Sequence, residues 1–379
     1  MFEKEHIDSA SVMVAGCGAL GNEVVKNLVL TGIRHLVIVD FDVVENGNLT
    51  RSVFFTNDDE GRNKVDVLAE RLTARYPDID VQTICGDVAY DVGLGLIREM
   101  DVVIGCLDNR EARYALNRLC HRANKPWVDG GITMTDGTVR VFVPGKNCYA
   151  CNLPPEVVDD MKRRASCSGA IRQAQASDHA PTTSITASIV GAVMAQEALK
   201  QITGDDSTLC GKMFCYEATQ PSARIVEFCA YDEDCPCHEI WSPVKETEIS
   251  TDMTVGETLA LLAEMFPECS EFAITLDDSF VDYVEDSLSG KTMQVMLPSR
   301  KVAERLATVH GNVETECAEK SSHIEVQMYN LQNEYNRIDK NFPYQELTLA
   351  ALGIPERQIL PVVTENCEFY IQMNNGRTI

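Results

Sequence analysis

The feature that most constrains the fold is a glycine-rich turn near the start of the chain. Residues 11–15 have the apolar pattern of a buried strand, and the motif G-x-G-x-x-G at residues 16–21 follows at once and opens the helical pattern of residues 22–30. Asp40 ends the next predicted strand, 24 residues after the first glycine. Glycines allow a tight turn, and free N–H groups at a helix N-terminus bind phosphate. The segment therefore predicts a nucleotide site at the edge of a parallel sheet.

The alternation of strands and helices continues through the first 145 residues. Such a rhythm is typical of a parallel sheet covered by helices. Further strands are expected at 36–39, 81–84, 102–106, 127–129 and 138–143, with helices at 64–76, 110–123 and 183–202. We expect an α/β fold: a Rossmann-like domain with a mixed, mainly parallel sheet, followed by a small α+β domain.

Charged and amide side chains after Asp40 distinguish between nucleotides. The glycine motif alone predicts an NAD-dependent dehydrogenase, with Asp40 on the ribose hydroxyls. The segment that follows adds an acid, an amide and cations, which is more charge than NAD needs and suits a triphosphate. These residues are Asp42, Asn48, Arg51 and Lys64.

A second polar group follows the strand predicted at 102–106. Asp108 and Asn109 come directly after it, and Arg113 and Asn117 follow at four-residue steps on one face of the next helix. A carboxylate at the carboxyl end of a parallel strand is well placed to hold Mg²⁺ on a nucleotide. We expect Asp108 to be this magnesium ligand.

This set of motifs resembles the ThiF/MoeB adenylyltransferases and the related adenylation domains of ubiquitin-activating enzymes, over roughly residues 11–240. The resemblance implies that Gly16, Gly18 and Gly21 form the ATP loop and that Asp40 binds the ribose. It further implies that the phosphates are bound by Asn48 and by two residues that also act in catalysis, Arg51 and Lys64, with magnesium on Asp108 beside Asn109.

Two close cysteine pairs predict a zinc site. Cys148 and Cys151 form a C-x-x-C pair, and Cys235 and Cys237 form a C-x-C pair far along the chain. Four thiolates of this kind can bind structural zinc tetrahedrally. The family that this chain resembles usually has two C-x-x-C pairs. The second pair is closer together here, so His238 could replace one of the thiolates.

A polar and basic segment at 152–182 interrupts the regular pattern and contains Cys167 beside Arg163 and Arg164. Nearby cations stabilise a thiolate and favour its nucleophilic reactivity. In the resembling modifier-activating enzymes, the crossover loop before the next helix carries the thioester cysteine. We expect Cys167 to be that catalytic nucleophile, with Cys210 and Cys215 as the next candidates.

The composition changes near residue 239, which gives domains at 1–238 and 239–379. From Glu246 onward there are 23 acidic and 9 basic residues. The ending, from Thr348 through Val363 into a strand at 367–373, resembles the ubiquitin-fold domain of ubiquitin-activating enzymes. That domain recruits the basic N-terminal helix of a conjugating enzyme, and the acidic charge suits this use. Residues 300–342 match no pattern.

These motifs predict an ATP-dependent activator of a ubiquitin-like protein, with ATP, Mg²⁺ and Zn²⁺ as cofactors and a conjugating enzyme as a partner. Two alternatives stay open: a sulfur-carrier adenylyltransferase of cofactor biosynthesis, and a non-catalytic scaffold subunit of an activating complex. The resemblance implies a homodimer, although no arginine precedes Ser11 to complete a neighbouring ATP site, as one does in many relatives.

Net charge, hydropathy and cysteine content bear on three further properties: nucleic-acid binding, membrane insertion and the cellular compartment. The net charge of −25 argues against nucleic-acid binding, which depends on Lys and Arg. The longest apolar stretch, residues 185–199, contains Gln196 and Glu197 and is too short for a membrane span. With no signal-peptide pattern and 15 cysteines, we expect a reducing cytoplasm in which the cysteines are buried, metal-bound or reactive.

Overall fold

A computed structural model of the chain describes residues 4–133, 135–154, 156–158, 182–227, 231–269, 271–286, 290–302 and 329–374. The chain divides into two compact units, whose boundary in sequence falls between Ser242 and Pro243. The boundary expected from composition is at 238/239. Among the described residues, no helix is long and apolar enough to cross a membrane.

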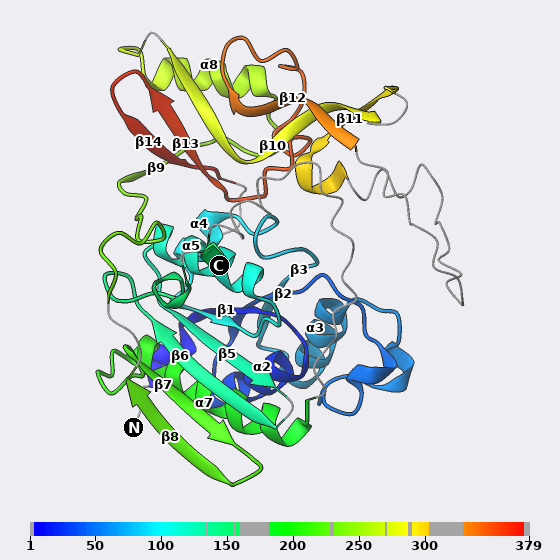
Figure 1. Cartoon of the computed structure of the whole chain (residues 1–379), viewed down its shortest axis with the longest axis vertical. Helices are drawn as coiled ribbons and strands as arrows, with labels where there is room; N and C mark the ends of the chain where they lie inside the picture. Colours follow the sequence, from blue (N-terminus) through cyan, green and yellow to red (C-terminus); the bar gives the residue numbers. More distant parts are fainter. Residues whose placement is uncertain are drawn as a thin grey trace. The chain divides into compact units, whose positions relative to one another are not determined.

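The first unit contains an eight-stranded sheet with the order β3-β2-β1-β4-β5-β6-β7-β8 (Figure 1). The first five strands in this order pair in parallel, and β6, β7 and β8 extend the sheet in antiparallel fashion. The prediction of a mixed, mainly parallel α/β sheet is therefore confirmed. The strands are β1 (Ser11–Ala15), β2 (His35–Val39), β3 (Asp80–Ile84), β4 (Val102–Gly105), β5 (Trp127–Thr133), β6 (Asp136–Phe142), β7 (Lys212–Glu217) and β8 (Ser222–Glu227).

Helices cover both faces of this sheet, with α2 and α7 packed together on one face and α4 and α5 on the other (Figure 1). The apolar residues of β1, β2 and β4 are buried between these layers, as parallel strands require. The α-helices are α1 (Lys4–Asp8), α2 (Ala19–Thr31), α3 (Lys64–Arg75), α4 (Leu94–Glu99), α5 (Arg110–Arg122) and α7 (Ser184–Thr203). Among the residues that the structure describes, 3₁₀ turns lie at Asn46–Asn48, Asn57–Asp59 and Ala150–Asn152.

The strand order reverses between β1 and its neighbour β4. Chain connections leave β1 toward β2 on one side, whereas β4 leads away toward β5 on the other. In open α/β sheets, ligands bind in the crevice outside the carboxyl ends of the strands at such a switch point. The residues that follow β1 and β4 are the glycine motif and the Asp108 turn, so the topology brings the two predicted motifs to one edge.

The second unit is a small α+β structure. Its sheet has the order β11-β10-β13-β14-β9, and β12 also pairs with β10. Helix α8 begins at a capping box in which Thr254 and Glu257 exchange hydrogen bonds, and its apolar face joins the core of this unit. The elements are β9 (Val244–Glu246), α8 (Val255–Met265), β10 (Phe272–Asp286), β11 (Thr292–Pro298), β12 (Tyr329–Ile338), β13 (Ile359–Thr364) and β14 (Glu368–Gln372). The ubiquitin fold itself stays a prediction for this unit.

Candidate functional site

The glycine turn after β1 has a backbone geometry that requires glycine at two of the three glycine positions of the motif. Gly16 has φ of +96°, and a Cβ on it would lie 2.4 Å from the carbonyl oxygen of Cys106. A Cβ on Gly21 would lie 1.9 Å from the carbonyl oxygen of Gly16. Around Gly18, by contrast, a Cβ would meet no atom within 4 Å. The turn therefore packs tightly on the protein side and stays open at the N-terminus of α2, where a phosphate can approach.

Asp40 closes this turn from the end of β2. Its Oδ2 accepts a hydrogen bond of 2.6 Å from the N–H of Cys17, and its Oδ1 accepts one of 2.8 Å from the N–H of Asp42. Burial raises the pKa of Asp40 above its usual range, while Lys64 and these N–H groups act in the opposite direction. The carboxylate thus fixes the glycine turn and the following segment to each other, which is the position expected of a ribose ligand.

Lys64 is buried and reaches the same place from the start of α3. Its Nζ lies 2.7 Å from Oδ2 of Asp42, and its backbone N–H donates to the carbonyl oxygen of Asp42. A buried ammonium needs a partner, and the carboxylate of Asp42 supplies it. The structure therefore brings together Asp40, Asp42 and Lys64 around the glycine turn.

Asn48 and Arg51 lie in the segment between β2 and α3. Asn48 is buried, and its Oδ1 accepts a hydrogen bond of 2.9 Å from the N–H of Glu45, which shapes the 3₁₀ turn. Arg51 is half-buried and makes no ion pair with any residue that the structure describes. A guanidinium without a carboxylate partner is suited to an anionic ligand.

The turn after β4 presents Asp108 and Asn109 at the surface. Asn109 caps α5, because its Oδ1 accepts a hydrogen bond of 2.7 Å from the N–H of Ala112. Its Nδ2 donates to Oδ1 of Asp108 at 3.1 Å. An exposed carboxylate beside an amide offers the hard oxygen donors that Mg²⁺ prefers, so the residues present fit a magnesium ion.

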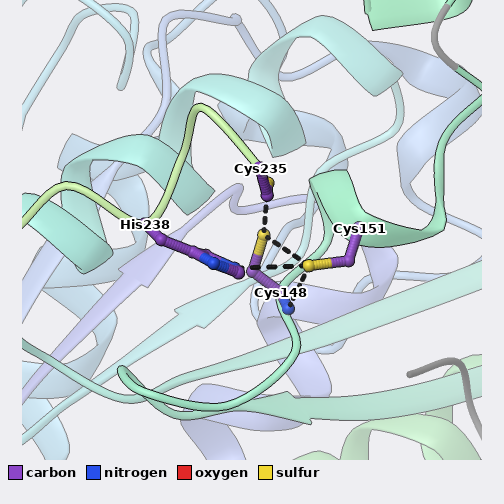
Figure 2. A group of neighbouring side chains, drawn as sticks. All are labelled: Cys148, Cys151, Cys235 and His238. Carbon is purple, nitrogen blue, oxygen red and sulfur yellow. Dashed lines mark hydrogen bonds between the residues drawn. The ribbon is translucent and has the colours of Figure 1, made fainter. Parts of the chain in front are cut away.

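Three cysteines and one histidine converge in the same unit, as Figure 2 shows. Sγ of Cys148 lies 3.6 Å from Sγ of Cys235 and 3.6 Å from Sγ of Cys151, and Nε2 of His238 lies 3.2 Å from Sγ of Cys151. Tetrahedral zinc with Zn–S bonds of about 2.3 Å separates two sulfurs by about 3.8 Å. The hydrogen bond from Cys148 holds the pKa of Cys235 well below its usual range. The donor set and its spacing fit a structural zinc ion.

The fourth member of this group is His238 and not Cys237, so the structure favours the second of the two arrangements that the sequence left open. Cys237 is also buried but does not belong to this group of four side chains. The imidazole of His238 points toward the sulfur atoms in Figure 2 and stacks on the ring of Tyr231, with centroids 4.5 Å apart.

Helix α5 supports the Cys148 turn through Asn117. Nδ2 of Asn117 donates to Sγ of Cys148 at 3.4 Å, and Oδ1 accepts from the N–H of Tyr149 at 3.0 Å. One helical turn further on, His121 stacks on His238. Such contacts from outside the ligand set orient the ligands themselves.

Cys167, the predicted nucleophile, lies outside the described residues. The other thiols considered for this role, Cys210 and Cys215, are half-buried beside β7 and in it. Burial raises the pKa of Cys210, which disfavours the reactive thiolate.

Sequence reasoning missed a buried ion-pair group in β5, at the last residue that pairs with β4. Asp129 is fully buried and contacts both Arg113 and Arg140. The signal available in the sequence was an aspartate directly after the apolar residues of a predicted strand and directly before two glycines. An acid in that place requires a cationic partner.

The fold and the site together are those of a nucleotide-binding type of α/β domain, with a cluster of three cysteines and one histidine that could hold a metal ion. The model of the ThiF family matches residues 3–237, so the chain belongs to this family, in its E1-like adenylyltransferase type. The remaining residues, 238–379, lie outside this match.

Three known proteins illustrate the similarity. The sulfur carrier protein adenylyltransferase of Thermus thermophilus is 32% identical over 227 residues, which cover 58% of this chain and 79% of that protein. The ubiquitin-like modifier-activating enzyme 5 of Drosophila ananassae is 31% identical over 221 residues, which cover 53% and 52%. The crystal structure of E. coli MccB with AMPCPP and MccA superposes with a TM-score of 0.51 at 23% identity, covering 62% of this chain and 68% of that one, and supports the fold.

Proposed function

We propose that this chain activates a ubiquitin-like protein in two half-reactions and passes it to a conjugating enzyme. In the first, a C-terminal carboxylate oxygen of the modifier attacks the α-phosphorus of ATP, pyrophosphate leaves, and an acyl-adenylate forms. In the second, the thiolate of Cys167 attacks the acyl carbon, AMP leaves, and a thioester forms. Two easier steps replace one difficult acyl transfer.

The observation that carries this proposal is the convergence of the glycine turn, Asp40 and the Asp42–Lys64 pair at the switch point of a ThiF-family sheet. Asp40 is suited to the ribose hydroxyls, and the open N–H groups at Gly18 are suited to the phosphates. Lys64 and Arg51 stabilise the charge that develops on the phosphates in the transition state. Magnesium held at Asp108 would supply further charge neutralisation there.

The Cys148 group would hold zinc in a structural role. It ties the turn after β6 to the segment after β8, which are distant in sequence and contribute two ligands each. Four protein ligands leave no open coordination position, as is typical of structural sites.

The second unit supports modifier activation over the alternatives. It lies beyond the ThiF match and is strongly acidic, which suits docking of a basic segment of a conjugating enzyme. A sulfur-carrier adenylyltransferase needs no such partner, so the acidic unit would have no counterpart in its reaction.

A sulfur-carrier adenylyltransferase is the second candidate, because relatives of that name match this chain as well as modifier-activating enzymes do. The two reactions share the acyl-adenylate and differ in their products. Modifier activation yields a thioester that reductant cleaves and then a protein conjugate, whereas sulfur transfer yields a thiocarboxylate. Mass spectrometry of the small protein after reaction distinguishes the two.

The first half-reaction is tested with Asp108→Ala. We expect this variant to lose ATP–pyrophosphate exchange, because the metal on the nucleotide loses its carboxylate. Normal exchange in a folded Asp108→Ala protein would remove Asp108 from the metal role.

The second half-reaction is tested with Cys167→Ala. We expect the variant to keep pyrophosphate exchange and to lose the adduct that reductant cleaves on a non-reducing gel. Cys215→Ala is the matched control and should keep both. A labile adduct that persists in Cys167→Ala would show that another cysteine is the nucleophile.

A further inference from the structure

The guanidinium of Arg113 connects the Asp108 turn to the middle of strand β5. One terminal nitrogen, Nη2, donates to the carbonyl oxygen of Leu107 at 2.7 Å and to that of Gly130 at 3.0 Å. Leu107 is the residue directly before Asp108, and Gly130 lies in β5. A single side chain on α5 therefore holds two backbone segments at a fixed separation.

A buried carboxylate keeps this guanidinium in place. Nε of Arg113 lies 3.1 Å from Oδ1 of Asp129, whose side chain is fully buried. Arg140 contacts the other oxygen, Oδ2, from the neighbouring strand β6. A buried carboxylate is stable only when its charge is paired, and Asp129 is within ion-pair distance of both arginines, with a hydrogen bond from Arg140 to Oδ2. Asp129 and Arg140 thus fix the direction in which Arg113 points.

The adjacent glycine provides the room for this arrangement. A Cβ on Gly131 would lie 3.2 Å from Nη2 of Arg113 and 3.3 Å from Oγ1 of Thr138. These separations are tighter than ordinary van der Waals contacts. The side chain that reaches Leu107 therefore passes over backbone that has no side chain of its own.

Asp108 is exposed, and the backbone of this turn sets the place from which its side chain extends. Asn109 holds the C-terminal side of the turn through the cap on α5. Arg113 holds the N-terminal side through the carbonyl of Leu107. We propose that Arg113 is a positioning residue: it sets the Asp108 carboxylate where it can bind the metal of Mg·ATP. This inference rests on the proposed adenylation function and assigns a role to a residue that does not itself touch ATP.

The test compares ATP binding with and without Mg²⁺ by titration calorimetry in Arg113→Gln. This variant removes one cation from a group of two arginines and one aspartate, so Asp129 keeps Arg140 as its partner and no buried charge is left unpaired. We expect Mg·ATP to bind about tenfold more weakly, the effect of losing roughly one charge-assisted hydrogen bond. ATP in excess EDTA should bind as in wild type, because the glycine turn and Asp40 are unchanged.

Two further variants complete the experiment. Arg113→Lys keeps a positive charge but has a single nitrogen, which cannot replace both Nε beside Asp129 and Nη2 on the two carbonyls, and it should give an intermediate loss of Mg·ATP affinity. It decides the question if Arg113→Gln does not fold. Arg122→Gln is the matched control: Arg122 lies on the same helix, pairs with Glu239 at 3.4 Å and stacks on Trp241, and its loss should change neither titration.

Two outcomes would overturn the inference. Folded Arg113 variants could bind Mg·ATP as tightly as wild type, or they could lose affinity equally with and without Mg²⁺, which would indicate a general structural role. Wild-type protein that binds no ATP under either condition would instead overturn the proposed function, so the two failures are distinguishable.

Discussion

Gly21→Ala should destabilise the first unit, because the new methyl group has no space. Its Cβ would lie 1.9 Å from the carbonyl oxygen of Gly16, where ordinary contacts begin at 3.4 Å. The backbone of the nucleotide loop must therefore shift by roughly 1.5 Å, and overpacking of this kind costs up to about 3 kcal/mol. The higher helix propensity of alanine returns about 1 kcal/mol. The free energy of unfolding should fall by about 2 kcal/mol, which corresponds to a decrease in Tm of about 4–8 °C for a unit of this size.

Tryptophan fluorescence measures this change in the first unit alone. The chain has two tryptophans, Trp127 in β5 and Trp241, and both belong to that unit. Thermal unfolding followed by their emission therefore reports the stability of the nucleotide-binding unit without a contribution from the other unit.

Gly18→Ala is the matched control, because a methyl group there meets no protein atom within 4 Å and φ of −70° is allowed for alanine. Its Tm should stay close to that of wild type, since glycine and alanine at a helix N-cap differ by about 1 kcal/mol or less. ATP binding should weaken, because the methyl group stands where phosphate approaches. An unchanged Tm in Gly21→Ala, or wild-type ATP affinity in Gly18→Ala, would refute this description of the loop.

Further predictions concern the metal group, pH and the second unit. Metal analysis of the purified protein should find about one zinc per chain. The variant His238→Ala should lose the zinc and Cys237→Ser should keep it. The reverse pattern would contradict the assignment of His238 as the fourth ligand. Burial raises the pKa of Asp40, so this carboxylate takes up a proton at a pH above the ordinary aspartate range. ATP affinity, measured at a series of pH values, should therefore weaken before the pH falls to that range. An affinity that stayed constant down to that range would contradict the prediction. Deletion of residues 246–379 should preserve the adenylate and the Cys167 thioester but abolish transfer to the conjugating enzyme, and a gel showing transfer by the truncated chain would exclude the docking role.

Local sequence patterns predicted the strand, turn and helix around the candidate nucleotide site. Strand β1, the glycine turn and α2 are consecutive in sequence, and backbone geometry requires glycine at Gly16 and Gly21. The hairpin of β7 and β8 was not predicted, because β8 is largely exposed and lacks an alternating apolar pattern.

Contacts between distant residues could not be predicted in the same way. Asp129 and Arg140 are direct partners across the antiparallel pair β5–β6, and only the register of that pair brings them together. Cys237 and His238 are consecutive in the sequence, so cysteine spacing could not show which of the two side chains joins Cys148, Cys151 and Cys235. The residues that position the site therefore depend on tertiary structure more than the residues that form it.

ATP–pyrophosphate exchange in the presence of small ubiquitin-fold proteins from the source organism tests the central claim most directly. The proposed function predicts exchange that requires Mg²⁺, one such protein and its free C-terminal carboxylate, and that stops when this carboxylate is amidated. Tight ATP binding without exchange in the presence of any of these proteins, or exchange that persists after amidation, would contradict the proposal that this chain adenylates the C-terminus of a protein.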